Sequence, residues 1–186
     1  MVLPKNYLIT PSVKHQEAFL QSLENSLKAG VELMQLRGKG MTPEAYRNLA
    51  EKVIGIAKQY NCKVLLTYAS LVEPLGADGL HMDSKQFAMC ERRLIPEPYI
   101  LAVSSHSLES LKKADRLKAS FAVLSPVKFT KAHPDLEPLG WDGFGDMVGQ
   151  VNIPVYALGG VSVEDTEDAI NAGGQGVAGS KGLWLS

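Results

Sequence analysis

The chain has 186 residues, of which 45% are hydrophobic and 21% charged, and its formal net charge is −1 at pH 7. This length predicts a single domain, residues 1–186, that is large enough to bury a full hydrophobic core. The near-zero charge gives no electrostatic reason to expect nucleic acid or an anionic membrane surface as a partner. The apolar runs are too short to span a bilayer, and the first residues lack the pattern of a signal peptide.

The two cysteines, Cys62 and Cys90, are far apart and have no CxxC spacing. A redox or metal pair would need the two thiols to be brought together. We therefore interpret them as reduced thiols and expect a cytoplasmic protein.

Eight short apolar or β-branched runs follow one another along the chain, and segments of helical period lie between them. The runs predict strands at residues 7–10, 32–37, 63–67, 79–82, 99–104, 121–125, 155–160 and 176–180. Thr42 followed by Pro43 predicts a helix start, because proline at the first helical position loses no needed donor. Ser162 with Asp165 resembles a capping box, and Gly173 is placed to end that helix.

This alternation predicts parallel βα units, which can form an open doubly wound sheet or a closed barrel. Eight repeats favour a compact (β/α)8 TIM barrel, although 186 residues is slightly below the usual lower limit of about 200. We expect short helices after the third and fourth strands, and a missing or clipped helix after the eighth.

Active sites of such barrels lie at the carboxyl ends of the strands. This rule selects mostly polar or glycine residues, which simple core strands would not need: Thr10, Gln35, Arg37, Thr67, His81, Ser104, Ser125, Gly159, Gly160, Gly179 and Ser180.

Two glycine clusters near the end of the chain predict a phosphate site. The first is Gly159–Gly160, and the second contains Gly173, Gly174, Gly176 and Gly179. We assign both clusters to the ends of the last two strands, where barrels often bind phosphate through backbone amides that no Cβ covers. Gly159, Gly160, Gly179 and Ser180 would bind the phosphate, and Lys181 would add a positive charge. Alternatively, the first pair only turns the chain and the second cluster only caps a helix.

The same residues carry a family resemblance over nearly the whole chain. "YLIT", "VELMQLRGKG", "GADGLHMD", "AVSSHSLE", "FAVLSPVKFT", "PVYALGGV" and "AGGQGVAGS" occur in the order in which the thiamine phosphate synthase family, with its thiazole tautomerase branch, carries similar motifs. The run from "AVLSP" through "LGW" to "PVYALGG" further resembles the synthase-like domain that some bacterial proteins carry behind a Nudix hydrolase domain. The resemblance implies a TIM barrel that joins a hydroxymethylpyrimidine diphosphate to a thiazole phosphate, releasing pyrophosphate with the help of Mg2+.

The resemblance also implies roles for single residues. Arg37 offers a planar fork to a diphosphate, Lys39 a point charge, and Gln35 a donor and an acceptor for a pyrimidine edge. The alternative is that "RGKG" is only a solvated basic turn. The full substrate-binding set implied is Gln35, Arg37, Lys39, Thr67, Thr130 and His133. A small phosphorylated heterocycle is the expected partner, and a homodimer is left open.

The sequence departs from the family pattern where the metal should bind. The family's acidic metal ligands follow the third and fourth strands, where this chain has Thr67–Tyr68 and Gln86. Mg2+ prefers carboxylates and phosphate oxygens, so we assign no metal ligands, and Asp83 and Asp78 are the nearest substitutes. His133 replaces a family lysine after the sixth strand, with Lys128 and Lys131 nearby.

His106, in "SSHS", occupies a histidine position of the family, and we select it with Ser104 as the catalytic candidates. Histidine suits proton transfer near neutrality, which the tautomerase branch performs without Mg2+. The second histidine of that branch corresponds here to Pro126; His81 and His133 are possible replacements, although His81 also fits a packed position. Three functions therefore compete: synthase, metal-independent tautomerase or salvage enzyme, and non-catalytic phosphate-ligand barrel. A sugar-phosphate isomerase or epimerase is a more distant alternative.

Overall fold

The computed structural model describes residues 2–130 and 136–186. Eight parallel strands form a closed barrel in sequence order, and β8 pairs with β1 through Tyr7 and Ala178. The strands are β1 (Asn6–Ile9), β2 (Leu33–Gln35), β3 (Lys63–Leu66), β4 (Gly79–Met82), β5 (Ile100–Ser105), β6 (Phe121–Leu124), β7 (Val155–Ala157) and β8 (Gly176–Gly179). The predicted (β/α)8 barrel is confirmed.

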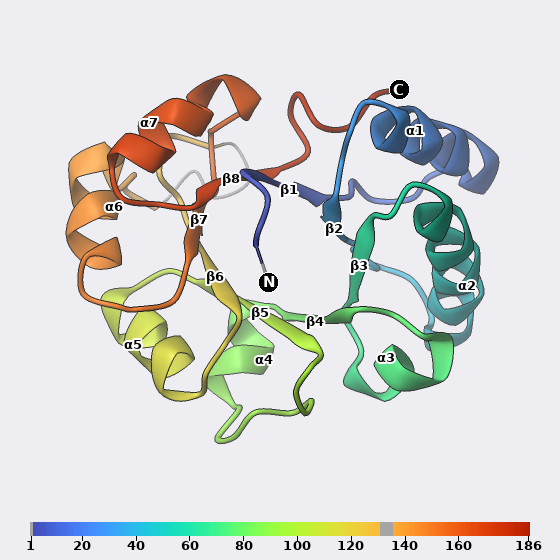
Figure 1. Cartoon of the computed structure of the whole chain (residues 1–186), viewed down its shortest axis with the longest axis horizontal. Coiled ribbons are helices and arrows are strands. Elements are labelled where there is room, and N and C mark those ends of the chain that lie inside the picture. The colour runs from blue at the N-terminus through green and yellow to red at the C-terminus, as the bar shows by residue number, and fades with distance from the viewer. Residues whose placement is uncertain (1, 131–135) are drawn as a thin grey trace.

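Helices surround the barrel on its outside (Figure 1). They are α1 (Gln16–Lys28), α2 (Pro43–Gln59), α3 (Ala69–Leu75), α4 (Ser84–Ala88), α5 (Leu108–Arg116), α6 (Gly140–Val148), the 3-10 helix η1 (Val163–Asp165) and α7 (Thr166–Asn171). The helices after β3 and β4 have 7 and 5 residues. The chain after β8 forms a turn and a short irregular end.

Helix α2 begins where the sequence predicted. Thr42 caps it, since its Oγ1 accepts a hydrogen bond from the amide of Ala45 at 3.2 Å, and Pro43 is the first helical residue. Inside this helix Tyr46 is fully buried, and its hydroxyl donates to the Leu36 carbonyl while accepting from the Thr67 amide. Tyr46 thereby joins the carboxyl ends of β2 and β3. This end of the barrel is where active sites of such folds lie.

The hydrophobic core has two layers. One lies between the strands and the helices; the other fills the barrel and includes Tyr7, Leu33, Leu65, Ile100, Ala102, Phe121, Val123, Tyr156 and Ala178. Side chains alternate along a strand, so the residues two positions beyond Leu33 and Ala102 also face the interior. This alternation places Gln35 and Ser104 inside the mouth of the barrel.

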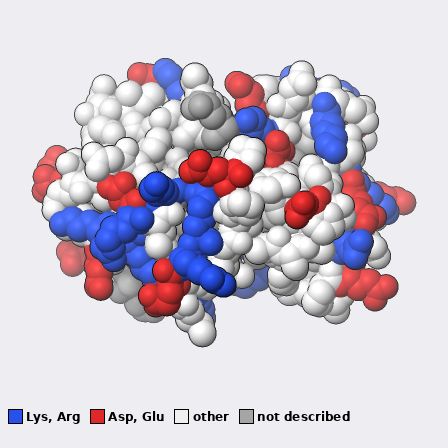
Figure 2. Space-filling view, turned by 60° about the horizontal axis from the view of Figure 1, so that its bottom comes forward, with Lys and Arg blue, Asp and Glu red and all other residues white. Residues whose placement is uncertain are grey.

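Cys62 and Cys90 are both buried and unbridged, as expected for reduced thiols. Burial raises the pKa of the Cys62 thiol to about 12, which disfavours the reactive thiolate. Within the described residues, no helix is long and apolar enough to cross a membrane. Figure 2 shows one face on which Lys and Arg side chains gather next to Asp and Glu side chains.

Candidate functional site

The loop after β2 presents two basic side chains at the carboxyl edge of the barrel. The amide of Arg37 donates to Thr10 Oγ1 at 2.9 Å, which fastens this loop to the end of β1. Gly38 lies directly on the ring of Tyr46, because a Cβ there would come within 2.1 Å of Tyr46 Cδ2. The backbone is therefore fixed, while Arg37 and Lys39 are exposed. Gln35 lies below them and is buried.

A chain of three polar side chains lies beneath the same edge. His81 is 1% exposed; its Nδ1 is 2.7 Å from the Tyr7 hydroxyl and its Nε2 is 2.8 Å from Ser104 Oγ. Burial lowers the pKa of His81 to about 3, so the imidazole is neutral at ordinary pH. These surroundings agree with the interpretation of His81 as a packed histidine and not as a replacement for the catalytic one. Ser104, at the end of this chain, is half-buried.

His106 lies beyond β5 and contacts the end of β6. Its Nδ1 is 2.9 Å from the carbonyl oxygen of Ser125 and 3.2 Å from Ser125 Oγ. A carbonyl oxygen only accepts, so Nδ1 carries the proton and Nε2 is the basic nitrogen of the neutral ring. The imidazole is thus held in one tautomer, as a proton-transfer residue requires.

The turn after β7 is built by close backbone approach. Gly159 and Gly160 have φ angles of +87° and +71°. A Cβ on Gly160 would lie 2.4 Å from the carbonyl oxygen of Phe129. The loop after β6 lies against this turn, since the Lys128 amide donates to the Gly159 carbonyl at 2.8 Å. The contact with the neighbouring loop, which sequence reasoning missed, is a second reason for glycine here.

Beyond β7 and β8, backbone amides are open to a ligand. Within the described part of the chain, the amides of Gly160 and Ser180 donate to no other residue. Gly179 ends β8 with its Cβ position 3.7 Å from Leu158, and Lys181 is exposed beside it. The two strands are neighbours in the barrel, so both turns lie at one edge.

The other glycines of the second cluster lie elsewhere. Gly173, with a φ of +87°, ends α7 as predicted. Gly174 follows it, and Gly176 is the first residue of β8. A Cβ on Gly176 would meet the Lys5 carbonyl oxygen, so this glycine serves strand packing. The expectation that the whole cluster ends the last strand is wrong: three of its glycines precede or open β8.

Two hollows on the outside of the barrel lie between α6 and α7 and have volumes of about 350 and 580 Å3. The larger one is lined by three carboxylates, those of Asp142, Asp146 and Asp168. Carboxylates repel a phosphate dianion, and neither hollow reaches the carboxyl ends of the strands. We therefore place the candidate site at the edge of the barrel.

Comparison with known proteins identifies the family. The family model described as "Thiamine monophosphate synthase" matches residues 6–183. The chain belongs to this family. A relative in Aquifex aeolicus, provisionally named thiamine-phosphate synthase 2, is 36% identical over 180 residues, 96% of this chain and 97% of the relative. Thiamine-phosphate synthase of Methanobrevibacter smithii is 32% identical over 174 residues, 92% of this chain and 83% of the relative.

A solved structure shares the fold. The thiamine phosphate pyrophosphorylase from Pyrococcus furiosus superposes with a TM-score of 0.76 and is 21% identical. The match covers 94% of this chain and 84% of that one. At this identity the likeness establishes the barrel architecture, which the strand order shows independently.

Around the positions after β3 and β4 where the family resemblance places the Mg2+ ligands, polar side chains are hydrogen-bonded to backbone groups. Thr67 Oγ1 donates to the Leu36 carbonyl at 3.2 Å. Asp83 Oδ1 accepts from the Gln86 amide at 2.8 Å, and Gln86 Oε1 accepts from the Asp83 amide at 3.1 Å. Together they form the capping box of α4. This donor set does not fit Mg2+, which proteins bind through carboxylates together with substrate phosphates, because its one carboxylate already accepts from the Gln86 amide.

Asp78, the other substitute carboxylate, also serves the backbone. Its Oδ2 accepts from the Val64 amide at 2.9 Å. Across residues 2–130 and 136–186, no group of three or more His, Cys, Asp or Glu side chains is placed to hold a metal ion.

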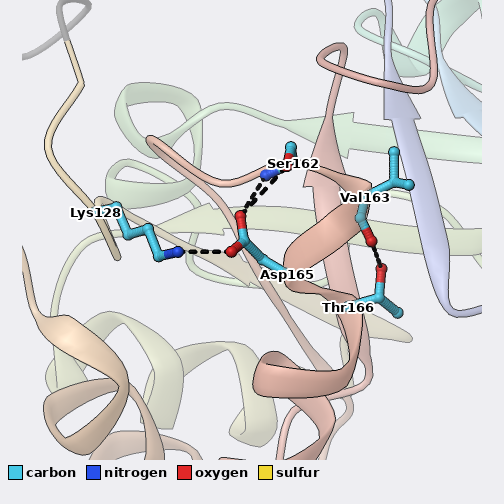
Figure 3. A network of polar contacts seen from close by, with 5 residues as sticks. All are labelled: Lys128, Ser162, Val163, Asp165 and Thr166. Carbon is cyan, nitrogen blue, oxygen red and sulfur yellow. Dashed lines mark hydrogen bonds and ion pairs between the residues drawn. The ribbon is translucent and has the colours of Figure 1, made fainter.

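Lys128 is next to the β7 turn but has an acidic partner. Its Nζ lies 2.6 Å from Asp165 Oδ1, and Asp165 Oδ2 accepts from the Ser162 amide at 2.8 Å (Figure 3). This confirms the predicted contact between Ser162 and Asp165. Burial raises the pKa of Asp165, but the hydrogen bonds from Lys128 and Ser162 outweigh it and lower the pKa overall. The carboxylate therefore stays charged and neutralises Lys128.

Two further predicted residues lie in the loop after β6. Thr130 is half-buried at the end of a described segment. His133 and Lys131 lie outside the described residues. Their predicted roles stay predictions.

Proposed function

We propose that the protein binds a phosphorylated thiazole or pyrimidine intermediate of thiamine biosynthesis at the carboxyl edge of its barrel. One observation carries this proposal: the amides of Gly160 and Ser180, in the turns that follow two neighbouring strands, have no acceptor within the described residues, and Lys181 lies beside them. Backbone amides and one cation suit a phosphate group. The names of the relatives, which are thiamine-phosphate synthases, support this ligand class.

The rest of the edge suits a ring and a second phosphorylated group. Arg37 is exposed on a fixed loop and can offer its planar guanidinium to a diphosphate. Gln35 and Ser104 face the mouth of the barrel below it, and both carry hydrogen-bonding groups for a heterocycle. The synthase reaction, in which the methylene carbon of the pyrimidine substrate loses pyrophosphate and bonds to the thiazole nitrogen, would need both substrates here.

A second function is favoured by His106. Its Nδ1 donates to the Ser125 carbonyl, which makes Nε2 the ring nitrogen that would exchange a proton with a substrate. Proton transfer on a thiazole needs no metal, and the side chains at the ends of β3 and β4 do not fit one. A metal-independent tautomerase is therefore the second candidate.

One assay separates the candidates. The protein is incubated with thiazole carboxylate phosphate alone, and then with thiazole phosphate and the pyrimidine diphosphate together, each with and without Mg2+. Thiamine phosphate is followed by mass, and isomerisation of the thiazole, which leaves the mass unchanged, is followed by NMR. Thiamine phosphate would support the synthase. Metal-independent isomerisation of the thiazole that is lost in His106→Ala would support the tautomerase, and saturable binding without turnover would support a binding protein.

Calorimetry with thiazole phosphate tests the site itself. Lys181→Ala is expected to weaken binding about tenfold, because it removes a charge-assisted contact. Lys5→Ala is the matched control, since Lys5 precedes β1 at the opposite end of the barrel. Equal effects of the two substitutions, or no saturable binding by the unmodified protein, would overturn the proposal.

A further inference from the structure

The Tyr7–His81–Ser104 chain is an unusual feature of the barrel interior. Tyr7 packs among aromatic residues, with ring centroids 5.0 Å from Phe121 and 5.8 Å from Tyr156. Its hydroxyl is nevertheless bonded to His81, which in turn reaches Ser104 at the mouth of the barrel. Polar groups buried among aromatic rings must be paired, and the pairing fixes where their protons lie.

The proton positions follow from the hydrogen-bonding capacity of Tyr7. Within the described residues, the Tyr7 hydroxyl has a single partner, Nδ1 of His81. If Nδ1 carried the ring proton, the Tyr7 proton would point into the aromatic core without an acceptor. Tyr7 therefore donates to Nδ1. Since the buried ring is neutral, its one proton is on Nε2.

This tautomer decides what Ser104 can do. Nε2 donates to Ser104 Oγ, so the hydroxyl accepts from His81 and its own proton must point elsewhere. The open direction is the mouth of the barrel, because Ser104 is half-buried at the end of β5. His81 cannot take the Ser104 proton, which a nucleophilic serine would require.

We propose that Tyr7 and His81 position Ser104 as a hydrogen-bond donor to an acceptor atom of the bound ligand. Ser104 is then a binding residue whose hydroxyl proton is oriented by His81, and Tyr7 and His81 are positioning residues. The inference rests on the proposed function only for the identity of the ligand. The tautomer itself is a property of the ligand-free protein.

The first test needs no ligand. In protein labelled with 15N in histidine, long-range 1H–15N correlation distinguishes the protonated from the unprotonated ring nitrogen. The His81 signals are assigned by their loss in His81→Gln. Nε2 is expected to be protonated and Nδ1 unprotonated at neutral pH. A proton on Nδ1 would overturn the inference, whatever the protein binds.

The second test is a double-substitution cycle measured by calorimetry with thiazole phosphate. In Tyr7→Phe, Nδ1 loses its donor, so the ring tautomer is no longer fixed and Ser104 is no longer held as an acceptor from Nε2. Tyr7→Phe and Ser104→Ala are each expected to weaken binding about tenfold, and the double variant no more than Ser104→Ala alone. Independent, multiplying losses would contradict positioning through Ser104.

Tyr156→Phe is the matched control. Tyr156 lies in the same aromatic cluster, but its hydroxyl donates to the Pro4 carbonyl and does not contact His81. Binding is expected to stay within about twofold of the unmodified protein. A loss equal to that of Tyr7→Phe would mean that both substitutions act through core packing. If the unmodified protein does not bind thiazole phosphate, the proposed function fails, while the histidine spectrum still decides the inference.

Discussion

The two sides of the barrel edge use their polar groups in opposite ways. At the ends of β3 and β4, the side chains of Thr67, Asp83 and Gln86 bond to nearby backbone groups. At the ends of β7 and β8, Gly160 and Gly179 carry no side chain, and the amides of Gly160 and Ser180 have no acceptor in the described chain. A polar residue at a strand end is thus no evidence of a site by itself. Its hydrogen bonds must still be available to a ligand.

The strongest test of this comparison changes the β7 turn. Gly160→Ala places a Cβ 2.4 Å from the Phe129 carbonyl oxygen and keeps a φ of +71°. The strain and the overlap together are expected to cost about 3 kcal/mol of unfolding free energy and to abolish binding of the phosphate ligand. Urea unfolding and calorimetry measure the two effects.

Gly30→Ala separates strain from overlap. Gly30 has a φ of +98°, but no atom lies within 4 Å of its Cβ position. It is expected to cost about 1 kcal/mol and to leave ligand binding unchanged. If both substitutions had the same effect, the contact between the β6 loop and the β7 turn would have no special importance.

The second prediction concerns His81 on β4, whose ring nitrogens are both hydrogen-bonded within the protein. The pKa of His81 is lowered from 6.5 to about 3 by burial. Below pH 6.5 the unfolded chain binds a proton that the folded protein excludes, so stability falls as pH falls towards 3. The expected loss is about 1.4 kcal/mol per pH unit, or about 2 kcal/mol between pH 6.5 and about 5.

Urea unfolding across this pH range checks the loss. His81→Gln cannot take up this proton, so its stability is expected to fall less steeply over the same range. Parallel curves for the two proteins would show that His81 does not titrate on unfolding and would contradict the buried neutral imidazole.

The sequence predicts the barrel well because its signals are local. Alternating apolar runs and helix starts such as Thr42–Pro43 depend on residues a few positions apart. The expected strand at 155–160 is longer than β7 (Val155–Ala157) because Gly159 and Gly160 leave the extended conformation. The sequence shows two glycines there, but their positive φ angles are known only from the folded turn.

The site was harder to predict because its contacts join distant parts of the chain. Tyr7 and His81 are 74 residues apart, and no periodicity indicates that one hydroxyl meets one imidazole. The same holds for Lys128 and Asp165, which are 37 residues apart. Motif order could suggest Gln35, Arg37 and Ser104 as site residues. It could not show which hydrogen bonds were already satisfied.

A third prediction tests the ends of β3 and β4, where the polar side chains are already hydrogen-bonded to backbone groups. Asp83→Ala removes the cap of α4 and is expected to cost about 1 kcal/mol, whereas Asp83→Asn keeps an acceptor and costs less. Neither is expected to change the affinity for the phosphate ligand or its response to Mg2+. A loss of Mg2+-dependent turnover in Asp83→Asn, at unchanged stability, would show that this carboxylate holds a metal.

The last prediction concerns the ends of β7 and β8, where the backbone amides are available to a ligand. Asp165→Asn keeps an oxygen for the Ser162 amide but removes a negative charge near the β7 turn and releases Lys128 from its partner. Affinity for the phosphate ligand is expected to rise about threefold, and more at low salt, because the removed charge repels the ligand partly through solvent. Glu167→Gln is the matched control: it removes the same charge from α7, but its partner Lys5 precedes β1. Equal gains from both substitutions would assign the effect to net charge alone, and weaker binding in Asp165→Asn would mean that the ion pair itself builds the site.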